Sequence, residues 1–335
     1  MIIVLAIAVL ILVIIRLVKK RDTRAVKRRR LFYKQAPIPA STGSGKHDSI
    51  IALWNKLEQD LPASYAEAVR SRTLQEHPDI SEQEFAWRWH ELKRFFVLCA
   101  LMNRVPMFSL KVDEIWHQML MFTREYEQFS NRYYGRMLHH APNAGSQPMP
   151  NERAWFDAVY VQCFGWNTYS AGLWGRFFTE PLPQEDLEMY ASRSVDLEQA
   201  SHWNMHGYRN RPEIRKAVDW LLQRLRTHVH TARRRNDNDL SPVDYSQSDA
   251  LFFNTVWFSM NEPQDFQKHM VDPQGEKVRG HSGSNCSSAS GCGYSDSGDN
   301  DSSSRHDSSR GHDSSGSSCS SCSSSSSGSS CSSSD

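Results

Sequence analysis

The stretch Val112–His140 constrains the fold of this 335-residue chain more than any other part of its sequence. Apolar and aromatic side chains recur there at spacings of three and four, at Val112, Ile115, Trp116, Met119, Phe122, Tyr126, Phe129 and Tyr133. This spacing places them on one stripe of an α-helix of about six turns, and such a stripe faces a protein core. Ser109 is suited to begin this helix and Gly135 to end it.

Polar residues accompany the stripe in two places. Asp113 and His117 are four residues apart, so they lie one turn apart on the flank of the predicted helix, where a carboxylate can hold an imidazole. His139 and His140 follow the helix. Imidazole nitrogens bind zinc and similar divalent metals, so His117, His139 and His140 form a candidate metal site, with Asp113 as a ligand or as the group that orients a histidine. The alternative is a structural Asp113–His117 pair that fixes how the helix docks.

The segment Val112–Pro142 resembles the glycine-rich domain-containing protein-like family. The residues that carry this pattern are Val112, Asp113, Trp116, His117, Gly135, His139 and His140. The resemblance implies a helical domain and adds Trp116 to the candidate site, but it implies no particular chemistry. The C-terminal tail departs from the plant-type members, because it is rich in Ser and Cys rather than in Gly.

The N-terminal residues Met1–Val18 are apolar except for Arg16. Eighteen residues of helix span about 27 Å, close to the hydrocarbon thickness of a bilayer. Basic residues follow this run and no charged residue precedes it, which predicts a single-pass membrane protein with an outside N-terminus and a cytoplasmic body. A core helix or a signal peptide is the alternative, although the basic region and the small-residue cleavage site of a signal peptide are missing.

The basic residues between positions 19 and 30 favour anionic lipid headgroups. Lys34–His47 contains two prolines and two glycines and is typical of a linker. We therefore predict a transmembrane helix at 1–18, a basic juxtamembrane segment and linker at 19–47, a helical domain at 48–270 and a tail at 271–335. The formal net charge of +1 argues against general polyanion binding.

The region 48–270 shows amphipathic helical periodicity and no convincing strand, so the predicted fold class is all-α, a multi-helix bundle. The tail combines Ser, Gly and Asp with very few apolar side chains, a composition that predicts disorder. Its cysteines are Cys286, Cys292, Cys319, Cys322 and Cys331. A flexible tail is the simplest interpretation; palmitoylation, metal capture and a redox-dependent crosslink are the alternatives.

Two further patterns suggest other chemistry. Cys99 or Cys163 could act as a nucleophile beside His117, although Cys99 lies on an apolar helical face where cysteines are inert. The basic helix 215–235 could bind RNA or acidic lipid, although such a charge run is usually a solvated surface. No recognised nucleic-acid module is present, so nucleic acid is an unlikely partner.

Taken together, these patterns favour a non-catalytic, membrane-anchored helical domain that docks an unknown protein partner. The first alternative is a metal-dependent enzyme, hydrolytic in type, centred on His117, His139 and His140 with zinc or another divalent metal. The second alternative is RNA binding through the basic helix.

Overall fold

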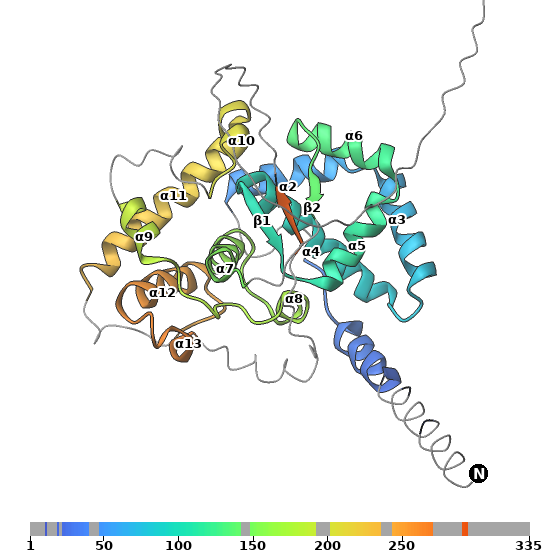
Figure 1. Cartoon of the computed structure of the whole chain (residues 1–335), viewed down its shortest axis with the longest axis horizontal. Helices are drawn as coiled ribbons and strands as arrows, with labels where there is room; N and C mark the ends of the chain where they lie inside the picture. Colours follow the sequence, from blue (N-terminus) through green and yellow to red (C-terminus); the bar gives the residue numbers. More distant parts are fainter. Residues whose placement is uncertain are drawn as a thin grey trace, which may run out of the picture. The chain divides into compact units, whose positions relative to one another are not determined.

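The computed structural model describes residues 22–39, 47–141, 148–191, 202–235, 243–270 and 290–293, together with Ile11 and Lys19. Over these residues the chain is mostly helical, as the sequence predicts (Figure 1). Beyond an N-terminal helix at 22–34, the helices are α2 (Asp48–Asp60), α3 (Ala63–Glu76), α4 (Glu82–Leu101), α5 (Leu110–Leu120), α6 (Thr123–Tyr134), α7 (Pro150–Phe164), α8 (Thr168–Trp174), α9 (Gln184–Ala191), α10 (Met205–Asn210), α11 (Pro212–Ala232), α12 (Ser248–Asn261) and α13 (Phe266–His269). The strands are β1 (Arg104–Met107), β2 (His139–Ala141) and β3 (Ser290–Gly293).

The domain is built around α4. Ser81 caps its N-terminus, because the Ser81 hydroxyl accepts a hydrogen bond of 3.2 Å from the Glu84 backbone N–H. Helices α2, α3, α5, α7, α8, α10 and α11 all contact α4. Most of its side chains are buried, so α4 is a central helix rather than a surface helix with one apolar face.

An ion pair lies inside this core. The side chains of Glu91 and Arg94 are fully buried, and an Arg94 nitrogen lies 3.0 Å from a Glu91 oxygen. Tyr160, Ser170 and Trp174 each donate a hydrogen bond to the Glu91 carboxylate. These donors replace water around the buried charge, and they tie α4 to α7 and α8.

The long helix predicted from Val112 onward is two helices, α5 and α6, separated at Met121 and Phe122. Its stripe is core on both sides of the break, since Trp116 and Tyr126 are buried. At the break, the Met119 carbonyl accepts a 2.9 Å hydrogen bond from the Tyr65 hydroxyl and a 3.1 Å hydrogen bond from the Phe122 N–H. In a continuous helix that carbonyl would accept from a residue four positions later. Gly135 ends α6 with a positive φ of 77°, as its sequence position predicts.

A small antiparallel sheet corrects the expectation of a chain without strands. Its order is β1-β3-β2, so β3 lies between the other two strands (Figure 1). Residues 290–293 fall inside the predicted disordered tail, yet they form the central strand of this sheet. The remaining predicted tail residues lie outside the described part of the chain.

The N-terminal helix is held to the domain by ion pairs. Arg29 lies 2.7 Å from a Glu84 oxygen and 2.6 Å from an Asp79 oxygen. Arg30 donates to the backbone carbonyls of Pro78 and Asp79. Part of the basic segment predicted to face lipid therefore binds the domain.

Residues just beyond this helix also belong to the folded unit. Tyr33 and Ala36 are buried in the core. Gln83 and Trp87 of α4 both donate to the Ala36 carbonyl, over 2.7 and 3.2 Å. Gly172 of α8 provides room here, since a Cβ on it would come within 3.1 Å of the Tyr33 hydroxyl. The part of the predicted linker that the structure describes is therefore not a free spacer over residues 34–36.

Within the described residues, no helix is both long and apolar enough to cross a membrane. Apart from Ile11, the predicted membrane helix at 1–18 lies outside the described residues. The predicted anchor, and the orientation inferred from it, stay predictions.

Candidate metal centre

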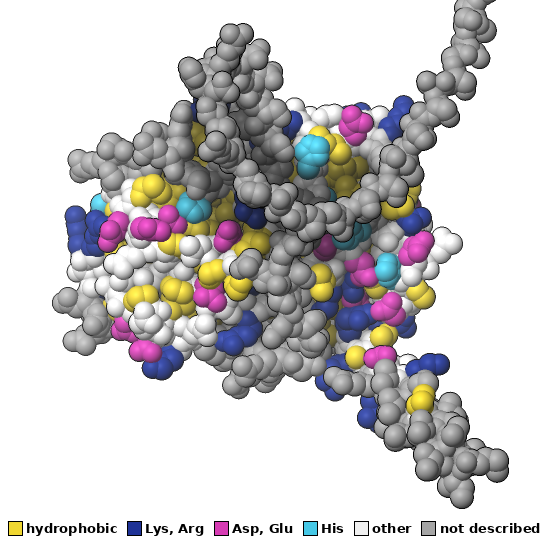
Figure 2. Space-filling model, in the orientation of Figure 1, with side chains coloured by type: hydrophobic (Ala, Val, Ile, Leu, Met, Phe, Trp, Pro, Cys, Tyr) yellow, Lys and Arg dark blue, Asp and Glu magenta, His cyan; other side chains and the backbone are white. Residues whose placement is uncertain are grey.

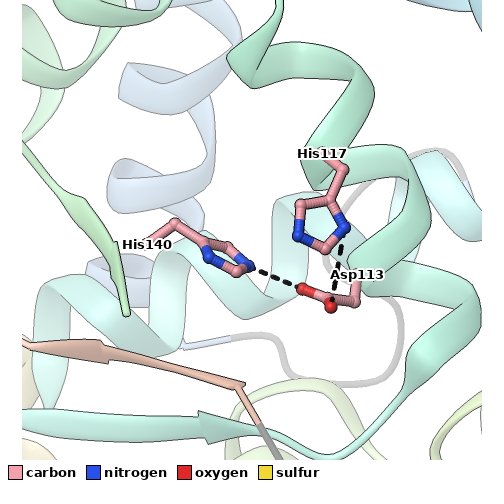
Figure 3. Close-up of side chains that lie close together, drawn as sticks. All are labelled: Asp113, His117 and His140. Atoms are coloured by element: carbon pink, nitrogen blue, oxygen red, sulfur yellow. Dashed lines mark hydrogen bonds and ion pairs between the residues drawn. The ribbon is translucent and has the colours of Figure 1, made fainter. Parts of the chain in front are cut away.

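Three side chains that can bind metal converge between α5 and β2. Asp113 and His117 come from α5, and His140 comes from β2 (Figure 3). A ligand atom of each lies within 4.8 Å of a ligand atom of the other two. His140 Nε2 is 2.8 Å from Asp113 Oδ1, which is a hydrogen bond, whereas His117 Nδ1 is 3.7 Å from Asp113 Oδ2. Asp113 thus lies between two imidazoles.

The helix α5 sets the positions of Asp113 and His117. The Ser109 hydroxyl accepts a 3.2 Å hydrogen bond from the Val112 N–H and fixes the start of the helix just before Asp113. His117 follows one turn later on the same side. The side chains of Asp113 and His140 are only 9% and 7% exposed, whereas that of His117 is 55% exposed. The site therefore has a buried half and a half that faces solvent.

The helix α6 and Trp116 set the position of His140. The backbone of Leu138, two residues earlier, is held at both polar groups: its N–H donates to Ser130 and its carbonyl accepts from Tyr126. The Tyr126 hydroxyl also accepts a 3.1 Å hydrogen bond from the Trp116 indole. The same indole ring lies edge-on to the His140 ring, with centroids 4.4 Å apart. Buried side chains of α5 and α6 therefore fix the strand that carries His140.

The predicted site and the observed cluster differ in one residue. Among the residues that the structure describes, the converging set contains Asp113, His117 and His140, whereas the exposed His139 lies outside it. Consecutive residues of a strand point to opposite faces, so β2 can present only one of its two histidines to Asp113. Nothing in the sequence indicates the supporting roles of Tyr126 and Ser130 at this site. Their spacing of four residues predicts that they lie on one side of a helix, but the sequence does not indicate the strand that they hold.

The three groups fit a divalent transition metal. Two imidazole nitrogens and one carboxylate oxygen are the ligands of many zinc sites and of mononuclear iron sites with open positions. Ligand atoms around tetrahedral zinc lie about 3.3 Å apart, so the set must contract from its 4.8 Å spread. The exposed His117 side chain has room for this movement. The proton shared by Asp113 and His140 must leave when a metal binds.

A second polar cluster lies beside this one on α5. Glu114 contacts His77, which directly follows α3, at 3.0 Å and also pairs with Arg88 of α4. Gln118 lies 3.4 Å from the other nitrogen of the His77 ring. These contacts join α3, α4 and α5, so they support the helix that carries Asp113 and His117.

The other residues singled out in the sequence do not gather at this site. Cys99 and Cys163 are buried in α4 and α7, and burial raises the pKa of the Cys163 thiol, which argues against a reactive nucleophile. On α11, Arg224 and His228 both contact Asp249 of α12. Figure 2 shows basic and acidic side chains interspersed across the face in view. Of the tail cysteines, only Cys292 falls within the described residues.

A comparison with known protein families matches residues 57–163 to a family described as UCP032817-like. The match covers less than half of the chain and includes Asp113, His117 and His140. It corrects the resemblance to the glycine-rich domain-containing protein-like family, because the matching family is a different one. No curated protein and no solved structure matches the chain. The family description names no activity, so a function must be argued from the geometry of the site.

Proposed function

We propose that this chain binds one divalent transition metal ion through Asp113, His117 and His140 and uses it for hydrolysis. The convergence of these three ligand atoms within 4.8 Å carries the proposal. Three protein ligands leave at least one coordination position for water, and a metal lowers the pKa of bound water enough to make hydroxide near neutral pH. The exposed side of His117 is where water and substrate would reach the metal.

Each residue has a separate part in this proposal. Asp113 supplies a negative oxygen that offsets part of the metal charge, and its second oxygen can keep one histidine oriented. His140 is the rigid ligand, because its strand and ring are packed against α6 and Trp116. His117 is the adjustable ligand at the solvent side. A hydrolytic reaction is the class that such a site supports without a redox partner.

Metal content of the purified full chain tests the proposal. We expect about one zinc, iron or manganese ion per chain, lost in an Asp113→Ala/His117→Ala/His140→Ala variant. His139→Ala is the matched control, because His139 is adjacent to His140 but lies outside the cluster, and it should keep its metal. Circular dichroism shows whether each variant is folded. A metal-free wild type after reconstitution, or a folded triple variant that keeps the metal, contradicts the proposal.

A second proposal concerns where this site works, and it retains the contact with anionic lipids that the sequence predicts for the basic residues 19–30. The exposed side chains of Arg24 and Lys27 on the N-terminal helix, with Arg29 fixed to Glu84, support a domain held close to an anionic membrane surface. Flotation of the full chain with vesicles tests this. Binding that does not increase when anionic lipid is added to neutral vesicles contradicts a role for the basic residues.

RNA binding gains no support. Arg224 of α11 is paired with Asp249, and Arg215 donates to the backbone carbonyls of Tyr208 and Arg209. Basic side chains held in this way are less free to meet phosphates.

A further inference from the structure

The open side of the candidate metal centre lies along the exposed edge of α5. Of the three proposed ligands, Asp113 and His140 have nearly buried side chains, whereas the side chain of His117 faces solvent (Figure 3). A substrate would therefore reach the metal across the surface around His117. The residues next to His117 on this edge decide which molecules can bind there.

An apolar patch lies one turn beyond His117. Met121, four residues after His117, caps α5 and keeps helical backbone angles, with φ −67° and ψ −20°, so its side chain is a neighbour of His117. Met121 is 62% exposed. Leu120 and Phe122 are half-buried against the core, and the Phe122 ring lies edge-on to Tyr65, with centroids 6.0 Å apart. The patch of Leu120, Met121 and Phe122 is therefore anchored from below and open to solvent.

In the opposite direction along α5 the surface is polar. Glu114, three residues before His117, lies 3.0 Å from His77, and the Gln118 amide lies 3.4 Å from the same ring. Leu110, another exposed apolar residue of α5, is seven residues before His117, which is about 10 Å along the helix axis. The surface around His117 thus changes from polar to apolar along the helix.

We propose that the substrate is a carboxylic ester with an apolar acyl group, and that Met121 is the residue that selects it. This inference rests on the proposed hydrolytic function. The two surfaces match the two halves of such a molecule: the acyl chain lies on the patch at Met121, and the alcohol half lies toward Glu114 and His77. Exposed apolar patches with a polar rim are typical of ligand-binding surfaces, and the flexible side chain of Met adapts to apolar groups of different shape.

The reaction is a balanced hydrolysis. Metal-bound hydroxide attacks the acyl carbon, and the bond between that carbon and the alcohol oxygen breaks. The departing alkoxide takes up the proton that the bound water released. One ester and one water therefore give one carboxylic acid and one alcohol, with no change in oxidation state.

Hydrolysis of p-nitrophenyl acetate and p-nitrophenyl hexanoate by the zinc-loaded full chain tests this inference. After correction for uncatalysed hydrolysis, we expect kcat/KM for the hexanoate to exceed that for the acetate by about tenfold or more, because the patch partly buries the additional methylene groups. Met121→Gln keeps the length of the side chain but makes it polar, so it should lower this ratio to about two or less. Met121→Leu should keep the ratio high. Leu110→Gln is the matched control, because Leu110 is an exposed apolar residue of the same helix outside the patch, and it should keep the wild-type ratio.

The outcomes separate this inference from the proposed function. If the zinc-loaded wild type hydrolyses neither ester faster than the metal-free chain, the hydrolytic function is wrong and the ester substrate is wrong with it. If the wild type hydrolyses both esters without preferring the hexanoate, or if Met121→Gln keeps the preference, hydrolysis stands and the selection by Met121 is wrong. Hydrolysis that persists in the folded Asp113→Ala/His117→Ala/His140→Ala variant would come from another site and would contradict both proposals.

Discussion

At the scale of single residues, Asp113 links the two histidines of the candidate site. Its nearly buried carboxylate accepts a 2.8 Å hydrogen bond from His140, while the exposed His117 lies farther away at 3.7 Å. A carboxylate that loses its only close partner in a buried position loses more stability than one that keeps it. His140 should therefore contribute more than His117 to the stability of the fold.

We predict that His140→Ala lowers the free energy of unfolding of the metal-free chain by about 1–3 kcal/mol, because Asp113 is left without its close partner. His117→Ala should lower it by less than about 1 kcal/mol, as expected for an exposed ion pair. Urea unfolding followed by tryptophan fluorescence measures both. An equal decrease in the free energy of unfolding in the two variants would contradict the prediction, because it would mean that the hydrogen bond from His140 is not the contact that stabilises the buried Asp113 carboxylate.

The sequence could predict part of this site at the residue scale. Asp113 and His117 are four residues apart in a helical pattern, so their proximity follows from helix geometry alone. The choice between His139 and His140 depends on which face of β2 meets α5. Three residues are too short a strand to show alternation, so that choice could not be predicted from the sequence.

At the scale of elements, α6 positions the site although it contributes no candidate ligand. Tyr126 and Ser130, one turn apart, hold both polar backbone groups of Leu138. The break between α5 and α6 had no signal in the sequence, because neither Gly nor Pro occurs there. The Met119 carbonyl at the end of α5 accepts a hydrogen bond from Tyr65, a residue more than fifty positions earlier in the chain.

We predict that Tyr126→Phe weakens metal binding by about 10–100-fold, because it releases the Leu138 carbonyl and loosens the strand that carries His140. Tyr133→Phe is the matched control, since Tyr133 is a buried tyrosine of the same helix whose hydroxyl donates to the Leu53 carbonyl. Each variant should cost about 1 kcal/mol of stability. Zinc titration against a chromogenic chelator measures the zinc affinity of each variant. Equal zinc affinities of Tyr126→Phe and Tyr133→Phe would show that Tyr126 has only a structural role.

At the scale of the whole molecule, two buried histidines link folding to pH. Burial is the main reason that the pKa of His228 is lowered from 6.5 to about 4, and nearby Arg224 lowers it further. Burial also lowers the pKa of His90 to about 2. Both residues are neutral in the folded chain near pH 7. As the pH falls below 6.5 they take up a proton in the unfolded chain first, so the unfolded state gains stability.

We predict that the folded state is stable above pH 6.5 and loses stability as the pH falls from 6.5 toward 4. His228 alone should account for a loss on the order of 3 kcal/mol over that range. Denaturant unfolding at a series of pH values measures the loss, and His228→Gln should flatten the curve. If the free energy of unfolding of this variant falls between pH 6.5 and 5 as steeply as that of the wild type, the prediction is wrong.

The helical character of the whole chain was predictable because helical periodicity is local in sequence. The sheet was not, since β1 and β3 are separated by more than 180 residues and β3 contains only Ser, Gly and Cys. The contact of Tyr33 and Ala36 with the core was equally hidden, because the prolines and glycines that follow them are typical of a linker.

The place of β3 between β1 and β2 bears on the order in which the chain is made. Ribosomes synthesise proteins from the N-terminus, so both outer strands leave the ribosome well before residues 290–293. Until then β2 lacks β3, the strand with which it pairs, and is held by the hydrogen bonds of Leu138 to α6 and by the contacts of His140 with Asp113 and Trp116 of α5. The sheet that contains the His140 strand is therefore completed late in synthesis. A nascent chain that stalls or is cut ahead of Ser290 would leave the edges of β1 and β2 unpaired and open to neighbouring molecules.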